Sequence, residues 1–210
     1  MEAIALQVDP GTVATGTNLV WALIAIFLIF FMHAGFAMLE SGQVRSKNVA
    51  NQLTKNMLTW AIGIVVFFFV GMGIANNLSI AGGGSASPLA MFDAAHMGGT
   101  GESAIDGWVM WLFSAVFAMT AATIVSGAVA GRAKLRAYLT YTFLLAAIIY
   151  PVVSGLVWYG GPGAFLTNLG FHDFAGGMVV HGVGGIAGLT AAWVLGARMD
   201  RYNADGSLNV

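Results

Sequence analysis

The sequence predicts an all-α protein that crosses a membrane several times. Of its 210 residues, 58% are hydrophobic and only 8% are charged, and the mean hydropathy is +0.82. A soluble domain contains about 25% charged residues, roughly three times as many. The apolar residues also fall in long runs, and the basic residues are confined to a few short segments. We therefore expect a polytopic membrane protein made of transmembrane helices.

Five apolar runs are long enough to cross a hydrocarbon core about 30 Å thick. They lie near residues 18–39, 57–76, 107–130, 137–159 and 174–197. The segment between the second and third runs is rich in glycine, serine and alanine, which predicts an exposed loop. We expect five transmembrane helices within one membrane domain that covers residues 1–210.

The basic residues predict the orientation of the chain. All eight fall in three clusters in alternate loops, which lie on the same side of the membrane: Arg45, Lys47, Lys55, Arg132, Lys134, Arg136, Arg198 and Arg201. Cytoplasmic loops of membrane proteins carry an excess of lysine and arginine. The amino terminus is therefore expected outside the cell membrane and the carboxyl terminus in the cytoplasm.

Composition also argues against several classes of function. A net charge of -1 offers no basic surface, so no nucleic-acid partner is expected. The absence of cysteine removes thiolate metal sites and cysteine nucleophiles. His33, His181 and Asp173 could suggest a metal site in a membrane enzyme, but no pair of ligands has the spacing of a metal motif within one helix. We expect no enzyme activity, no metal and no cofactor, and a structural role for Glu40 where the first helix reaches the inner interface.

The most informative stretch is DFAGGMVVHGVGGIAGLTAAW, residues 173–193. It places His181 inside an apolar run, where an ionisable group usually faces a pore or a polar partner. From position alone, a packing histidine remains the alternative. The glycines at 177, 184, 185 and 188 are expected to share much of its face and to let another helix approach. Asp173 is expected to cap the helix start, with His181 about 12 Å deeper at 1.5 Å per residue.

The stretch DFAGGMVVHGVGGIAGLTAAWVLGAR resembles the signature of the ammonium transporter (Amt/Mep/Rh) family. Three further segments resemble the same family in the same order: GFAMLESGQVRSKN, FSAVFAMTAATIVSGAVAGR and YPVVSGLVWYGG. The resemblance covers nearly the whole chain but only the first half of the family, whose members continue through a second, inverted five-helix repeat. It implies one half of an inverted-repeat transporter fold, with the second repeat absent. We expect a partial chain rather than a half that pairs with a separate second half or with itself.

The resemblance implies roles for four side chains. Phe117 and Trp158 match aromatic residues that bind ammonium at the outer vestibule, although both could instead be core or interface residues. His181 matches a pore histidine past which the deprotonated substrate travels. Asp173 matches an acid at the start of the fifth helix, where structural capping and support of the substrate both remain open. His172, just outside that helix, is expected to be solvated.

The implied function is transmembrane transport of ammonium, which is deprotonated near the pore mouth and crosses an apolar pore as ammonia. Methylammonium is a further substrate by analogy. The implied partners are the lipid bilayer, two identical subunits in a homotrimer and a cytoplasmic regulator of the PII type. The alternative is an ammonium-sensing receptor domain of a membrane signalling protein.

Overall fold

The computed structural model describes residues 10–79, 102–158 and 164–209. Five segments in these ranges are helical, apolar and long enough to cross a membrane: Gly11–Gln43, Ser46–Leu78, Gly107–Ala128, Leu135–Val157 and Gly177–Leu195. The predicted number of transmembrane helices is confirmed. Most of the Gly/Ser-rich segment, which the sequence predicts to be an exposed loop, lies outside the described residues.

π-Helical segments interrupt two of these spans and begin a third. The first span is α1 (Pro10–Gln43), and the third is α4 (Glu102–Ala128). The others combine α-helices with π-helical segments, namely α2 (Val49–Val66), η2 (Phe67–Gly71) and α3 (Met72–Ser79); α5 (Leu135–Leu144), η6 (Leu145–Ile149) and α6 (Tyr150–Val157); and η8 (Gly177–Gly182) and α8 (Val183–Leu195). A 3-10 turn, η1 (Ser46–Asn48), precedes α2, and the short helix α7 (Phe165–Asn168) lies between the fourth and fifth spans.

The observed helix bounds differ from the predicted ones at several ends. Helix α1 begins eight residues before the predicted position 18, because a hydropathy pattern marks only the part that crosses hydrocarbon and not helical turns beyond it. The fifth span begins at Gly177 rather than near 174. Gly176 has a left-handed backbone with φ of 87°, which an α-helix does not continue through.

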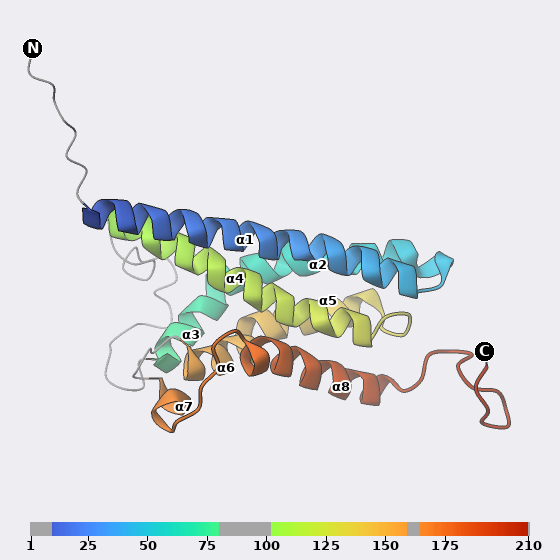
Figure 1. The fold of residues 1–210 in the computed structure, drawn as a ribbon. Coiled ribbons are helices and arrows are strands. Elements are labelled where there is room, and N and C mark those ends of the chain that lie inside the picture. Colours follow the sequence, from blue (N-terminus) through green and yellow to red (C-terminus); the bar gives the residue numbers. More distant parts are fainter. Residues whose placement is uncertain (1–9, 80–101, 159–163, 210) are drawn as a thin grey trace, which may run out of the picture.

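Helix α4 lies at the centre of the bundle. It packs against α1, α2 and α8, and its neighbours α1 and α8 run alongside it in Figure 1. The core around it includes Ala118, Ala121 and Val180, all almost fully buried. By contrast, α1 and α8 expose many large apolar side chains, such as Phe31 and Trp193. Such outer faces are typical of helices that contact lipid or further membrane helices.

The two ends of the bundle differ in chemistry. The α1–α2 turn, the α4–α5 turn and the carboxyl-terminal tail lie at one end, and α7 lies at the other (Figure 1). Seven of the eight basic residues lie in these two turns, in the first turn of α5 or in the tail, and Lys55 lies in the second turn of α2. We call this end the basic end and the other the α7 end.

Candidate functional site

A cavity of about 590 Å³ lies at the α7 end of the bundle. Its lining residues come from α4, from the segment that leads into η8 and from the position just after α6. The lining residues are Met110, Phe113, Ser114, Phe117, Trp158, His172, Asp173, Phe174 and Ala175. We call this cavity the vestibule.

An aromatic cluster forms one wall of the vestibule. The ring centroids of Phe117 and Trp158 lie 6.1 Å apart with an interplanar angle of 68°, an edge-to-face arrangement. Phe113 adds a second such contact, with its centroid 5.0 Å from that of Phe117. The family resemblance assigned Phe117 and Trp158 to the vestibule but did not include Phe113. Its position one helical turn before Phe117 was a signal that could have identified it.

A hydrogen bond fixes the orientation of Trp158. The indole N–H donates to the backbone carbonyl of Asp173 at 2.7 Å. This bond ties the end of α6 to the segment that opens the fifth span. Because the N–H is already engaged, Trp158 presents its aromatic ring and not a donor to the cavity.

The Asp173 carboxylate caps η8 with both of its oxygen atoms. Oδ1 accepts backbone N–H bonds from Gly176 at 2.7 Å and Gly177 at 3.0 Å. Oδ2 accepts from Met178 at 2.9 Å and Val179 at 2.8 Å. These donors are the first N–H groups of the helical segment, which have no partner within the helix itself. The structural role that the sequence left open for Asp173 is thus visible in its contacts.

The cap also determines the acidity of Asp173. Partial desolvation raises the pKa of the carboxyl group, but the four backbone N–H bonds together outweigh it. The pKa therefore lies below its usual value, and the group is ionised at neutral pH. A negative charge at a helix amino terminus is favourable because it faces the positive end of the helix dipole.

His181 lies in η8 with its side chain exposed. In the described ranges, no hydrogen bond to its ring is found, and an added Cβ at Gly177 or Gly185, four residues away on either side, would meet open space. The expected depth of about 12 Å below Asp173 assumes a continuous α-helix, whereas residues 173–176 are not helical and Gly177–Gly182 is π-helical.

The glycines of the fifth span divide between two faces: of the four expected to include several on the face of His181, Gly177 and Gly185 are on the open side and the other two face α4. A Cβ at Gly184 would lie 2.8 Å from the carbonyl oxygen of Ala121, and one at Gly188 would lie 3.1 Å from the Cβ of Ala128. These two glycines allow α8 to pack closely against α4. Gly185 stays on the open side with His181, so this side of the helix is left free.

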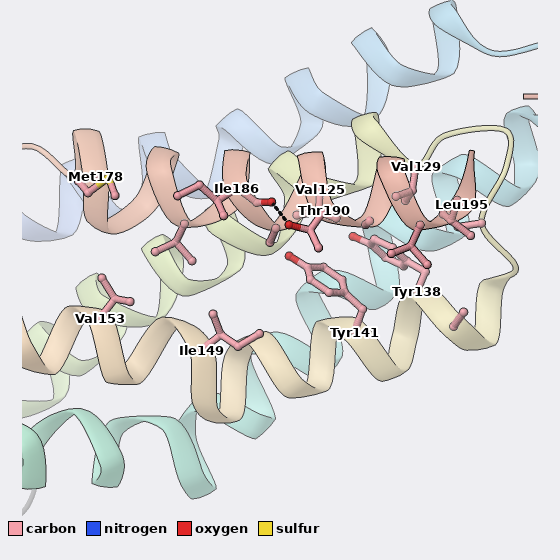
Figure 2. A pocket seen from close by; sticks show the side chains of 16 residues that line it. Val125, Val129, Tyr138, Tyr141, Ile149, Val153, Met178, Ile186, Thr190 and Leu195 are labelled. Atoms are coloured by element: carbon pink, nitrogen blue, oxygen red, sulfur yellow. Dashed lines mark hydrogen bonds between the residues drawn. The ribbon is translucent and has the colours of Figure 1, made fainter. Parts of the chain in front are cut away.

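A second cavity, of about 660 Å³, lies between α4, α5, α6 and α8. Figure 2 shows Tyr141 and Ile149 on one side, facing Ile186 and Thr190 of α8. The Thr190 hydroxyl donates to the Ile186 carbonyl at 2.8 Å. None of the described residues that line this cavity is charged at neutral pH. It therefore lacks an ionised group that could attract a cation, and we place the candidate site in the vestibule.

A buried polar cluster between α1, α2 and α4 escaped the sequence analysis. Glu40 was expected to reach the inner interface, but its side chain is buried between helices and only 4% exposed. Its carboxylate accepts hydrogen bonds from Gln52 Nε2 at 2.6 Å, Asn56 Nδ2 at 2.7 Å and Ser126 Oγ at 2.5 Å. These bonds join three helices, so Glu40 has the structural role that the sequence favoured, although in a different environment.

The same cluster extends to the α4–α5 turn. The Lys55 ammonium donates to the carbonyl of Ala133 at 3.2 Å and lies 5.8 Å from the ring centroid of Tyr138. The Tyr138 and Thr59 hydroxyl oxygens are 2.6 Å apart. In the described ranges, no group of three or more His, Cys, Asp or Glu side chains could hold a metal ion.

Comparison with known proteins now identifies the family. The model of the "Ammonium Transporter Family" matches residues 20–209, which is most of the chain. The chain belongs to the ammonium transporter family. It is 65% identical to "Ammonium transporter Amt2" of Haloferax mediterranei over 98% of this chain and 44% of that protein. It is 41% identical to "Ammonium transporter Amt2" of Archaeoglobus fulgidus over 90% of this chain and 41% of that protein.

A solved structure of this family has a similar fold. The "Sensor Amt Protein" matches with a TM-score of 0.76 and 33% identity, over 91% of this chain and 47% of that one. The chain thus spans less than half the length of these ammonium transporter relatives. Family membership and the five-helix fold are established by these matches, as the sequence predicted, and a multi-pass membrane protein follows from both.

Proposed function

We propose that this chain forms the vestibule and one pore-lining helix of an ammonium transporter. The observation that carries the proposal is the vestibule itself, in which the Phe117–Trp158 pair and the anionic Asp173 lie beside the start of the helix that exposes His181. Residues 1–210 would then be the amino-terminal five-helix repeat, and a second repeat would complete the pore.

Recruitment of ammonium at the vestibule has a physical basis in the described contacts. An aromatic face attracts a cation by about 0.5–2 kcal/mol through its quadrupole. The ionised Asp173 adds a negative charge close to the same cavity. Together they compensate in part for water that the cation loses as it leaves solution. We therefore assign Phe117 and Trp158 to substrate binding and Asp173 to its support.

Passage of the substrate depends on loss of its proton. Neutral ammonia can cross an apolar pore, whereas an ion such as potassium keeps its charge and meets the full cost of desolvation. The exposed imidazole of His181 can accept or donate a hydrogen bond to ammonia at little cost. We assign it to the pore, with its open helical face lining the pathway.

The orientation and assembly follow the same proposal. The basic end of the bundle would face the cytoplasm, since it holds all eight basic residues. The amino terminus and the vestibule would then face outside. A homotrimer and a PII-type cytoplasmic regulator remain part of the proposal through the family resemblance, as does methylammonium as a substrate.

Transport by the natural protein in liposomes tests this function. An ammonium gradient should produce uptake or current, and His181→Ala should reduce the initial rate by about tenfold or more, as expected for loss of a hydrogen bond to the substrate. The matched control is Met57→Ala, because Met57 is 72% exposed on α2 and lies away from the vestibule. Equal rates for the wild type and His181→Ala would overturn the role of His181.

A sensor is the second candidate, because the structurally similar relative is titled "Sensor Amt Protein". A sensor would bind ammonium without ammonium-dependent flux. Binding measured in detergent, together with flux measured in liposomes on the same preparation, separates the two functions. Binding without flux would favour the sensor and contradict transport.

A further inference from the structure

Three polar side chains line the vestibule among the described residues: Ser114, His172 and Asp173. They differ in how far their hydrogen-bonding capacity is already used. Both oxygens of Asp173 accept two backbone N–H bonds each. This carboxylate can attract a cation over a distance, but its acceptor sites face η8.

Ser114 and His172 have acceptor capacity left. The Ser114 hydroxyl donates its proton to the Met110 carbonyl at 2.9 Å, and its oxygen lone pairs remain available. The His172 side chain is exposed, and no hydrogen bond to its ring is found in the described ranges. A neutral imidazole always carries one nitrogen that accepts a hydrogen bond.

We infer that His172 is a further substrate-contacting residue of the vestibule, which accepts an N–H bond from ammonium. This inference rests on the proposed binding of ammonium in the vestibule. Ammonium has four N–H donors and no acceptor, so aromatic faces alone leave part of its donor capacity unsatisfied. His172 and the Ser114 oxygen supply acceptors beside the Phe117–Trp158 pair.

The expected size of the effect is modest. Loss of the hydrogen bond that His172 accepts should raise the apparent KM for ammonium by about threefold to tenfold.

The test compares His172→Gln and His172→Leu with the wild type in liposomes. Glutamine keeps a side-chain oxygen that can accept a hydrogen bond, so its KM should stay close to that of the wild type; leucine has no acceptor, so its KM should rise. Leu169→Gln is the matched control, because Leu169 is 70% exposed on the same segment but does not line the vestibule. It should keep the wild-type KM.

The inference can fail independently of transport. If His172→Leu leaves KM unchanged, or if His172→Gln raises KM as much as His172→Leu does, His172 does not accept a hydrogen bond from the substrate. If the wild type shows no flux, transport is refuted, and ammonium affinity in detergent decides the inference. A lower affinity of His172→Leu than of the wild type would support it, and equal affinities would overturn it.

Discussion

Substitution of Asp173 by asparagine should destabilise the start of the fifth span. Asparagine keeps one oxygen but places an amide N–H₂ group where the other oxygen accepted two N–H bonds. Two backbone donors of η8 would then face a donor. Loss of a helix cap costs about 0.5–2 kcal/mol, and because four bonds depend on this group we expect about 1–2 kcal/mol. For a chain of this size, that corresponds to a decrease in Tm of roughly 2–8 °C.

The pH dependence of this loss has a defined sign. The pKa of Asp173 is lower in the folded protein than in the unfolded chain. Its stabilisation is therefore fully present above the unfolded value of about 3.9 and is lost as the pH falls through the folded value. The difference in Tm between wild type and Asp173→Asn should be constant near neutral pH and should shrink only below about pH 4.

Thermal unfolding in detergent, followed by circular dichroism, measures both effects. Asp200→Asn is the control, because Asp200 forms an exposed ion pair with Arg45 at 3.5 Å and such pairs contribute about 0–1 kcal/mol. A Tm for Asp173→Asn equal to that of the wild type would refute the capping argument. A difference that persists unchanged well below pH 4 would refute the assignment of the stabilisation to the ionised carboxylate.

Two further substitutions test the packing of the fifth span and the aromatic wall. Gly184→Ala should cost about 1–3 kcal/mol, because the new Cβ would lie 2.8 Å from the Ala121 carbonyl oxygen, and thermal unfolding should show a lower Tm. Gly185→Ala should not lower Tm, since nothing lies within 4 Å of its new Cβ. Trp158→Leu should raise the KM for ammonium by about three- to tenfold through loss of its quadrupole, with Trp158→Phe intermediate. Equal KM values for the leucine and wild-type proteins in liposome flux would contradict the assignment of Trp158.

The sequence predicts local features of this chain well because they depend on composition within one helix. The five spans follow from runs of apolar residues, and the separation of basic from non-basic ends follows from their positions along the chain. The interface between α4 and α8 is different. Which face of α8 packs against α4 depends on where α4 lies, so glycine spacing alone could not assign Gly184 to that interface and Gly185 to the open face.

The polar cluster around Glu40 was outside the reach of sequence reasoning for a related reason. Glu40 and Ser126 are 86 residues apart in the chain, and their hydrogen bond exists only because α1 and α4 are neighbours. From sequence alone, a carboxylate near the end of an apolar run is expected to reach water, because the side chains that donate hydrogen bonds to it are not known. The contact of Trp158 with the Asp173 carbonyl is likewise non-local.

Three sets of contacts along η8 and α8 hold this span in place, and none of them involves the His181 side chain. At the α7 end, the Asp173 carboxylate accepts hydrogen bonds from four N–H groups. In the middle, Gly184 allows close contact with α4. At the basic end, the Arg132 guanidinium donates to the carbonyl oxygens of Ala128 in α4, Ala192 in α8 and Gly196 just after α8.

These contacts all involve the ends of η8–α8 or its face toward α4, while His181 lies on the open face. A functional side chain is held most precisely when it projects from a rigid element that is anchored elsewhere. Because the anchors do not touch the imidazole, substitution of His181 can change conduction without loosening the helix. The same separation explains why a stability defect in Asp173→Asn and a transport defect in His181→Ala are expected as distinct phenotypes.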